Sequence, residues 1–385
     1  MRILEDIIKD EIRTAGPMTF ERFMDLALYH GEYGYYGSGR ARIGKAGDFY
    51  TSPGATPVFG KLVAEIYLSL KEASGLAEFE FVEMGAGEGH LAKDFLDSIL
   101  RLHPREYEEA KYTIIEPFEG MRKRQREALA GHQGKVTWLR TLDELPDPVC
   151  GVFFSNELVD SFPFHLLDFY WEGMKEFYVS LERGELAWSR GPVSDPLIAR
   201  YFNRLGLTLE PGTKTEVNLR ACEWVRRLSE KLNKGFVITI DYGYSAFDYY
   251  SSLRKEGTLL CYYRHSTNDN PLELIGEQDI TAHVDFTSLA VEGRDSGLEP
   301  ILFTDQTSFL LEALGSISKA LSEAGAPQEE LEKTGLGLKT VLHPDWMGGA
   351  FMVLVQSKGL NVPGVFGKTR NLIGELGLPD QRVAL

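Results

Sequence analysis

The chain has 385 residues, of which 43% are hydrophobic and 25% are charged; this is the composition of a globular protein, and the length allows one elaborated α/β domain or two to three smaller ones. Its 57 acidic and 41 basic side chains give a formal net charge of −16, which disfavours nucleic acid as a partner because such binding depends on neutralising phosphates. The three cysteines form no pair with metal-site spacing, and their odd number argues against a disulfide framework.

The first 29 residues are predicted to form two helices that are separated at Gly16-Pro17, with Thr19 as the N-cap of the second. The first helix carries acidic side chains that a signal peptide or a transit sequence would lack. No apolar run approaches the length of a transmembrane helix. The sequence therefore favours a cytoplasmic protein that does not insert into a membrane.

Between residues 29 and 53 the chain is dense in tyrosine and glycine. Structured chains rarely use so many of these residues in a plain connector, so we interpret this stretch as a lid or a ligand loop. The alternative is that its tyrosines pack beneath a loop. Thr56-Pro57 is a typical helix start, and residues 1–75 as a whole are predicted to form an N-terminal helical and lid region.

A short strand, a glycine turn and an amphipathic helix are predicted in succession between Phe79 and Leu102. This succession is the opening unit of a nucleotide-binding α/β sheet. Glycines are needed there because the turn is tight and because a ligand must approach the backbone closely. The helix behind the turn presents free N–H groups to that ligand.

The spacing of the glycines narrows the choice of ligand. The turn reads Glu83-x-Gly85-x-Gly87-x-Gly89, with the third glycine one residue earlier than in the dinucleotide pattern, and it is similar to motif I of class I S-adenosylmethionine (SAM) methyltransferases. That motif implies an acidic residue that ends the next strand and holds the ribose hydroxyls, and Glu116 stands there. We therefore expect SAM as the cofactor, with Gly85 and Gly87 approaching its methionine moiety. Gly89 completes the turn and is also expected to bind the cofactor, and Glu83 is expected to brace the turn or to reach the amino group of the cofactor.

Strands and helices alternate through much of the chain. This predicts a class I SAM-methyltransferase fold, which is a Rossmann-like α/β fold with a mostly parallel seven-stranded sheet, here with an N-terminal helical extension and insertions. The predicted strands are 79–84, 111–116, 135–139, 149–155, 235–241, 300–303 and 350–356. The predicted helices that cover them are 89–102, 119–130, 223–234 and one that follows residue 286.

The predicted methyltransferase core consists of residues 76–160 and 221–358. It is interrupted by residues 161–220, which begin with two hairpin strands and are predicted to form an inserted subdomain on the substrate side. A helical insertion is predicted at 304–348, inside the second part of the core. Residues 359–385 form a short C-terminal tail of mixed composition.

Motifs outside the glycine turn point to a family. In chain order they are Gly16-Pro17, Leu28-Tyr29-His30 with Gly34-Tyr35-Tyr36, Gly47-Asp48-Phe49 with Thr51-Ser52-Pro53, Phe59-Gly60, Asn156-Glu157 with Asp160 and Pro163, Asp241-Tyr242-Gly243, and Asp279-Ile280-Thr281-x-His283-Val284-Asp285-Phe286. Together with the turn they resemble the MidA family of SAM-dependent methyltransferases from about residue 12 to about residue 356. Mitochondrial members of that family are protein arginine methyltransferases that act in the assembly of respiratory complex I.

The resemblance implies methyl transfer to an arginine of a protein substrate, with a complex I subunit as a candidate. Glu157 is then expected to be the carboxylate that orients the guanidinium and localises its lone pair. The side-chain carbonyl of Asn156 is expected to be a second hydrogen-bond acceptor for the guanidinium and also to contact the cofactor. Asp160 is the alternative candidate for the carboxylate. These residues follow a predicted central strand, where ligands of open α/β sheets bind. The alternative is that Asn156 and Glu157 cap a following helix.

The remaining candidate residues lie in the N-terminal loop and near residue 280. Asp48 and Ser52 are expected to close over the SAM from the loop. Tyr36, His283 and Asp285 are expected on the acceptor side, although a histidine in an apolar segment is more often a satisfied core group. No cluster of histidine, cysteine and acidic residues predicts a metal site.

The sequence departs from the family pattern at three places. The turn contains Ala86 and Glu88 in place of the usual proline and arginine, Gly54 stands where a glutamate is usual, and Leu158-Val159 replace two aromatic residues. The glycines and acidic residues expected at the cofactor are retained.

Two other functions stay open at this point. DNA and RNA amino-methyltransferases place an Asn-Pro-Pro-Tyr motif after the fourth strand, but here Asn156 is followed by an acidic residue, and the net charge is unfavourable. The second alternative is a non-catalytic SAM-binding assembly factor, which the departure at Gly54 supports and the intact Glu83 and Glu116 oppose. The sequence leaves the oligomeric state open, with a homodimer as one alternative.

Overall fold

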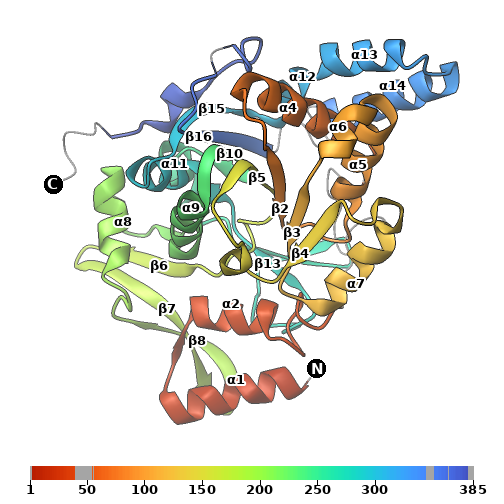
Figure 1. Cartoon of the computed structure of the whole chain (residues 1–385). Helices are drawn as coiled ribbons and strands as arrows, with labels where there is room; N and C mark the ends of the chain where they lie inside the picture. The colour runs from red at the N-terminus through yellow and green to blue at the C-terminus, as the bar shows by residue number, and fades with distance from the viewer. Residues whose placement is uncertain (1, 40–53, 55, 344–350, 363, 380–385) are drawn as a thin grey trace.

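The computed structural model describes residues 2–39, 54, 56–343, 351–362 and 364–379 (Figure 1). The centre of the molecule is a sheet in the strand order β15–β16–β10–β5–β2–β3–β4. Its strands are β2 (Glu80–Met84), β3 (Tyr112–Ile115), β4 (Val136–Leu139), β5 (Val149–Asn156), β10 (Leu232–Tyr244), β15 (Glu299–Asp305) and β16 (Phe351–Lys358). Each corresponds to one of the seven strands that the sequence predicts.

The five adjacent strands β4, β3, β2, β5 and β10 are parallel to one another, whereas β16 runs antiparallel to both β10 and β15. A two-residue strand, β14 (Val284–Asp285), adds a parallel pairing at the end of β10. The mostly parallel seven-stranded sheet is confirmed, and β14 is an addition that the sequence analysis did not predict. Because helices cover both faces, the central strand β5 is apolar on both sides and buried along most of its length.

Helices pack on the two faces of this sheet in separate apolar cores (Figure 1). Phe81 and Phe154 point into the core formed with α4 and α5, whereas their neighbours Val82 and Phe153 point into the core formed with α9 and α11. This alternation is the two-residue period of a strand. The helices are α4 (Val58–Ser74), α5 (His90–Leu102), α6 (Pro104–Glu109), α7 (Glu119–Ala128), α9 (Leu219–Lys231) and α11 (Phe286–Asp295).

The helix predicted at 223–234 differs from the prediction at both ends. It begins at Leu219, because the side chain of Asn218 caps it by accepting the N–H of Ala221 at 2.9 Å. It ends at Lys231, because Leu232 already pairs with β5 as the first residue of β10. The predicted cap of the second N-terminal helix is confirmed, since Thr19 Oγ1 accepts the N–H of Arg22 at 3.2 Å.

A second sheet of five strands contains residues from both the N-terminus and the region after β5. Its order is β1–β7–β6–β9, with β8 paired to β7, and α1 and α2 pack on it in a common apolar core, at the bottom of Figure 1. Its elements are α1 (Arg2–Ala15), β1 (Met18–Thr19), α2 (Phe20–Tyr29), β6 (His165–Tyr170), β7 (Gly173–Glu182), β8 (Glu185–Gly191), α8 (Leu197–Leu205) and β9 (Lys214–Val217). The two helices and the hairpin β6–β7 were predicted; β1, β8, α8 and β9 were not.

The remaining elements are a small sheet and a helical arm. The sheet has the order β12–β11–β13, and the arm, α12 to α14, projects at the upper right of Figure 1 and contacts α4. The strands of the small sheet are β11 (Leu260–Tyr263), β12 (Ser266–Asn268) and β13 (Asp279–Thr281), and the helices of the arm are α12 (Gln306–Leu311), α13 (Leu314–Glu323) and α14 (Gln328–Leu342). A short helix, α10 (Ala246–Tyr249), follows β10. Short 3₁₀ helices are η1 (Ala130–His132), η2 (Leu142–Glu144), η3 (Ser252–Arg254) and η5 (Ile373–Leu376).

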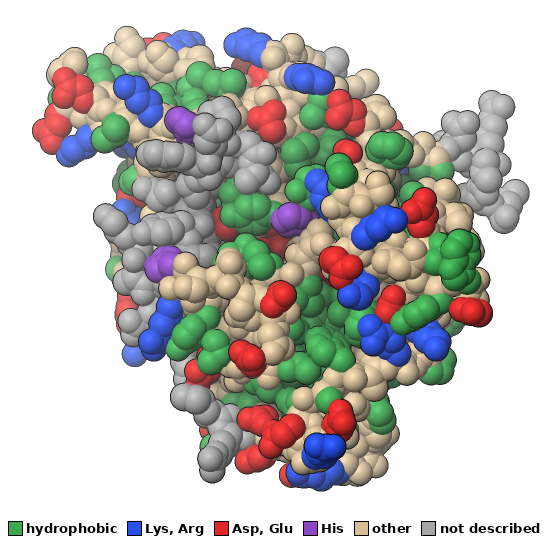
Figure 2. Space-filling view, turned by 180° about the vertical axis from the view of Figure 1, so that it is seen from behind, with side chains coloured by type: hydrophobic (Ala, Val, Ile, Leu, Met, Phe, Trp, Pro, Cys, Tyr) green, Lys and Arg blue, Asp and Glu red, His purple; other side chains and the backbone are tan. Residues whose placement is uncertain are grey.

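The described surface carries both signs of charge. On the face shown in Figure 2, acidic and basic side chains are interspersed with apolar ones. Among the described helices, none has both the length and the apolar character that crossing a membrane requires.

Candidate functional site

A cavity of about 560 Å³ opens at the carboxyl ends of β2, β3 and β5, which is within the volume range of small-molecule sites. Its walls come from the glycine turn after β2, from the segments after β3, β4 and β5, from the end of α2 and the loop after it, and from α9. The lining residues that the sequence analysis proposed are Tyr36, Glu83, Gly85, Gly87, Glu116, Asn156 and Glu157. They meet here because the carboxyl ends of parallel strands lie at one edge of the sheet.

The turn between β2 and α5 has a backbone that glycine favours. Gly85 has a φ of 76° and Gly87 a φ of 51°, in the left-handed region where a Cβ atom is costly. A Cβ atom on Gly85 would lie only 3.0 Å from Leu158 Cδ1. Backbone therefore forms this wall of the cavity. Gly89 lies behind the wall as the N-cap of α5 and does not line the cavity.

Glu83 is a buried acid beneath the turn. Its side chain is 3% exposed, and its Oε2 accepts the hydroxyl of Tyr112 at 2.7 Å. Burial raises the pKa of this carboxyl to about 7, against the opposing effect of the hydrogen bond from Tyr112. A cationic group that entered the cavity would therefore favour the ionised form of Glu83.

Glu116 follows β3 and is held by donors on both carboxylate oxygens. The N–H of Phe118 donates to Oε1 at 3.0 Å, and Gln125 Nε2 donates to Oε2 at 3.2 Å. Burial raises the pKa of Glu116, and these two hydrogen bonds oppose that rise because they stabilise the charged form. Glu116 lines the cavity together with Pro117, Phe118 and Met121.

Asn156 and Glu157 stand at the end of β5 in a strained conformation. Glu157 has a φ of 53°, which is uncommon for a residue with a side chain, and Asn156 Nδ2 donates to Glu157 Oε1 at 2.9 Å. Asn156 Oδ1 is buried and has no hydrogen-bond partner among the described residues. Residues 157–164 form turns and bends rather than a helix, so the alternative that these two residues cap a following helix is wrong.

Asp241 organises the loop that follows Glu157, and the sequence analysis did not propose it as a site residue. Its Oδ2 accepts three consecutive backbone N–H groups, those of Leu158 at 3.2 Å, Val159 at 2.9 Å and Asp160 at 3.2 Å. Burial, and then the charges of Asp160 and Glu157, raise the pKa of Asp241 well above its usual range. The signal that could have identified it was its position at the carboxyl end of the strand beside β5.

Asp160 and Tyr36 lie on the side of the cavity that faces the N-terminal helices. Asp160 does not line the cavity, and burial raises the pKa of its carboxyl to about 7. The hydroxyl of Tyr36 donates to Asp279 Oδ1 at 2.8 Å, and its ring stacks on Tyr29, which in turn stacks on Phe118. Aromatic rings therefore connect the acceptor side that we predicted to the segment after β3.

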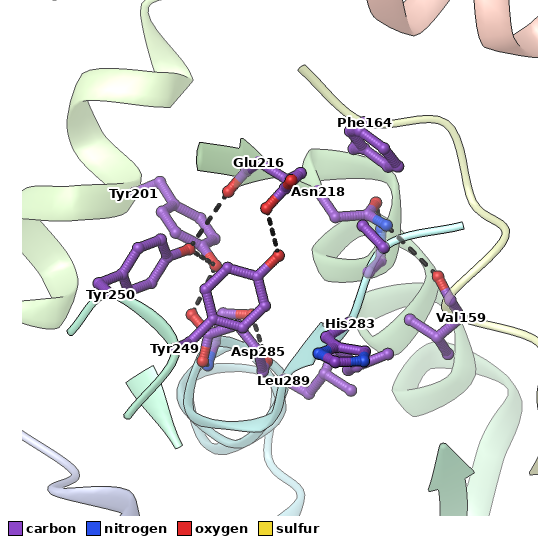
Figure 3. A pocket seen from close by; sticks show the side chains of 14 residues that line it. Val159, Phe164, Tyr201, Glu216, Asn218, Tyr249, Tyr250, His283, Asp285 and Leu289 are labelled. Carbon is purple, nitrogen blue, oxygen red and sulfur yellow. Dashed lines mark hydrogen bonds between the residues drawn. The ribbon is translucent and has the colours of Figure 1, made fainter. Parts of the chain in front are cut away.

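His283 and Asp285 line a different cavity, which has a volume of about 20 Å³ (Figure 3). Asp285 caps α11 by accepting the N–H groups of Thr287 and Ser288 on Oδ1, and its Oδ2 accepts the hydroxyl of Tyr201 at 2.6 Å. Burial lowers the pKa of His283 to about 4, so it is neutral at pH 7. The structure does not bring these two residues to the large cavity, and contact with an acceptor stays a prediction for them.

Two proposed residues, Asp48 and Ser52, lie outside the described residues. Within the described ranges, no group of three or more histidine, cysteine and acidic side chains is arranged to hold a metal ion.

Known proteins resemble the chain over most of its length. A family model for S-adenosyl-L-methionine-dependent methyltransferases matches residues 58–304. A mouse protein named "Protein arginine methyltransferase NDUFAF7, mitochondrial" is 26% identical over 373 residues, which cover 89% of this chain and 81% of the relative. A Caenorhabditis elegans homologue of the same name is 25% identical, over 76% of this chain and 72% of the relative.

A solved structure matches the fold closely. A protein from Burkholderia thailandensis, crystallised bound to S-adenosyl-homocysteine, has a TM-score of 0.84 and 29% sequence identity, with coverage of 96% of this chain and 95% of that one. A second structure from the same organism, in its native form, has a TM-score of 0.82.

One expectation from the sequence is contradicted by these names. The acidic first helix favoured a cytoplasmic protein, but the relatives from C. elegans, mouse and rat are all named mitochondrial. The acidic character of the first helix therefore does not establish a compartment.

Proposed function

Because the chain belongs to the family of S-adenosyl-L-methionine-dependent methyltransferases, we propose that it methylates a guanidinium nitrogen of an arginine side chain in a protein. The enzyme class and the cofactor SAM follow from the family and from the matching structure bound to S-adenosyl-homocysteine. The arginine acceptor is supported by the names of the curated relatives and by the acidic residues at the end of β5.

The large cavity fits the cofactor. Its volume suits a molecule of that size. The backbone of Gly85 and Gly87 forms one wall, where the methionine moiety would approach. Glu116 carries a carboxylate whose two oxygens are already oriented by donors, as the ribose hydroxyls would require. When bound, SAM supplies an electrophilic methyl group on a positively charged sulfur.

The observation that carries the acceptor proposal is the pair Asn156 and Glu157. Both line the same cavity as the glycine turn, and the left-handed backbone of Glu157 places a carboxylate there at an energetic cost of about 1–3 kcal/mol. Such strain is typical of functional sites. Asn156 Oδ1 is a buried acceptor that a guanidinium N–H would satisfy.

The acidic residues have defined tasks in this reaction. An arginine guanidinium is protonated at neutral pH and its nitrogen lone pairs are delocalised, so it needs a partner that orients it and accepts a proton. The Glu157 carboxylate accepts hydrogen bonds from the guanidinium, aligns the attacking nitrogen, and takes the proton that this nitrogen loses as its bond to the methyl carbon forms and the carbon–sulfur bond breaks. Asp241 holds the loop after Glu157 from behind.

The resemblance to the MidA family supports a more specific partner, which is a subunit of respiratory complex I. The net charge of −16 favours a basic segment around the methylated arginine.

The test uses isotopically labelled SAM with matched peptides that contain arginine or lysine. We expect label on arginine only. Glu157→Gln should lower turnover by about 10²- to 10⁴-fold while S-adenosyl-homocysteine affinity changes less than about twofold, whereas Glu116→Ala should abolish that affinity. The exposed Glu172 provides a control variant, Glu172→Gln, with wild-type turnover. Label on lysine, or normal turnover in Glu157→Gln, would disprove the proposal.

A further inference from the structure

The glycine turn and Glu116 are joined from behind by one side chain, that of Gln125 on α7. Gln125 Nε2 donates to the carbonyl oxygen of Gly87 at 2.8 Å and to Glu116 Oε2 at 3.2 Å. Gln125 is fully buried, with an exposed fraction of 0%, and is not among the residues that line the cavity. It therefore contacts both ends of the cofactor site without facing the cofactor.

The orientation of the Gln125 amide follows from its neighbours. Both neighbouring groups are oxygens that only accept hydrogen bonds, and the amide nitrogen carries two hydrogens, one for each. A flipped amide would place Oε1 against the two oxygens and lose both bonds. In the orientation observed, Oε1 is buried without a partner among the described residues, which costs free energy. The two donors of the Gln125 amide are therefore both used, one for the glycine turn and one for Glu116.

The rest of Gln125 supports the turn by packing. A Cβ atom on Gly89 would lie 3.4 Å from Gln125 Cα and 3.5 Å from its Cγ, so the turn rests directly on the stem of this side chain. Other residues on α7 act in the same region, since Arg122 donates to the backbone carbonyl of Glu116 at 2.6 Å and Met121 lines the cavity.

We propose that Gln125 is a positioning residue for SAM, which couples the ribose end of the cofactor site to the methionine end. Its amide donates to the Glu116 carboxylate, which favours the ionised form and aligns the carboxylate for the ribose hydroxyls. The same amide fixes the Gly87 carbonyl and thereby the turn that faces the methionine moiety. This proposal rests on the cofactor and is independent of the acceptor.

The test measures S-adenosyl-homocysteine affinity by calorimetry in Gln125→Met, which keeps the length of the side chain but removes both donors. We expect affinity about 10- to 100-fold weaker, as for the loss of a hydrogen bond to a charged group. Gln356→Met is the matched control. Gln356 is also buried and donates to the carbonyl of Leu289, its Oε1 has no partner within the described part of the chain, and it does not line the cavity. Its affinity should change less than about twofold.

A double-mutant cycle separates positioning from a general structural effect. If Gln125 acts through Glu116, then Gln125→Met should weaken binding much less in the background of Glu116→Gln than in the wild-type chain. An equal loss in both backgrounds, or no loss in the wild-type background, would overturn the proposal.

A second variant covers the case in which Gln125→Met does not fold. Gln125→Glu puts two carboxylates side by side, so they share a proton at low pH and repel each other at high pH. The affinity of this variant for S-adenosyl-homocysteine, divided by that of wild type, should fall as the pH rises from 6 to 9. The division by wild type removes the effects that both proteins share, which are the titration of Glu83 in the same cavity and the charge of Arg122 near Glu116. A constant ratio to wild type over this range would overturn the proposal.

Discussion

Replacing Gly85 with alanine should destabilise the protein by about 2–4 kcal/mol. The left-handed backbone at this position, with a φ of 76°, costs a residue with a Cβ atom about 1–2 kcal/mol. The new Cβ would also lie 3.0 Å from Leu158 Cδ1 and 3.3 Å from its Cβ, and overpacking of this kind adds about 1–2 kcal/mol. Since Leu158 lines the cavity, its displacement should also weaken S-adenosyl-homocysteine binding.

Gly75 provides the control for the backbone term alone. It ends α4 with a φ of 63°, and a Cβ atom there would meet nothing within 4 Å, so Gly75→Ala should cost only the first 1–2 kcal/mol. Urea unfolding of both variants and calorimetric titration with S-adenosyl-homocysteine measure the two effects. Adding Leu158→Ala to Gly85→Ala should return part of the affinity. Equal stability losses in the two glycine variants, with unchanged affinity in both, would refute the role assigned to the Leu158 contact.

Two further predictions concern stability. The pKa of Glu83 is about 7 in the folded protein and lower in the unfolded chain, where 4.5 is usual, so the folded state binds more protons between these values and its stability falls as the pH rises from 4.5 to 7. This loss of stability is up to about 3 kcal/mol, and Glu83→Gln should remove it. The measurement is the free energy of unfolding in urea at pH 5 and at pH 8, for wild type and for the variant. If the difference between the two pH values is the same in both proteins, Glu83 is not the buried acid responsible. Gly60→Ala should cost about 1–3 kcal/mol, because a Cβ atom would lie 2.6 Å from Asp94 Cβ and force α4 away from α5, whereas Gly131→Ala meets open space and should be nearly neutral in thermal unfolding.

The main sheet was predictable because its signals are local. Each strand is a short apolar run, and the turn at Gly85 marks where the first one ends. The second sheet was only partly predictable: Leu186 and Trp188 are the residues of β8 that pack against the apolar core, and both are only partly buried, so the alternating pattern is short and weak. The two-residue segment β1 is a strand only because it pairs with β7. These elements depend on distant partners that a local pattern does not contain.

The candidate site divides in the same way. Glu83 and Glu116 were identified from the turn and the end of the next strand, and the structure places both at the cavity. Asp241 was missed as an organising residue because its three N–H partners come from the loop after β5, which is distant from Asp241 in sequence and adjacent to it in space. Asp285 was placed on the acceptor side, although an aspartate directly before a helix is typical of an N-cap, which is the role it has.

The pairing of β1 with β7 has a consequence for synthesis of the chain. Met18 pairs with Val179, so the apolar faces of α1 and α2 lack their packing partner until roughly 160 further residues have been made. At ribosomal rates of about 5–20 residues per second, that delay is on the order of 8–30 s. During this time Phe20 and Phe23, which are fully buried in the finished molecule, are accessible to other nascent chains and to chaperones.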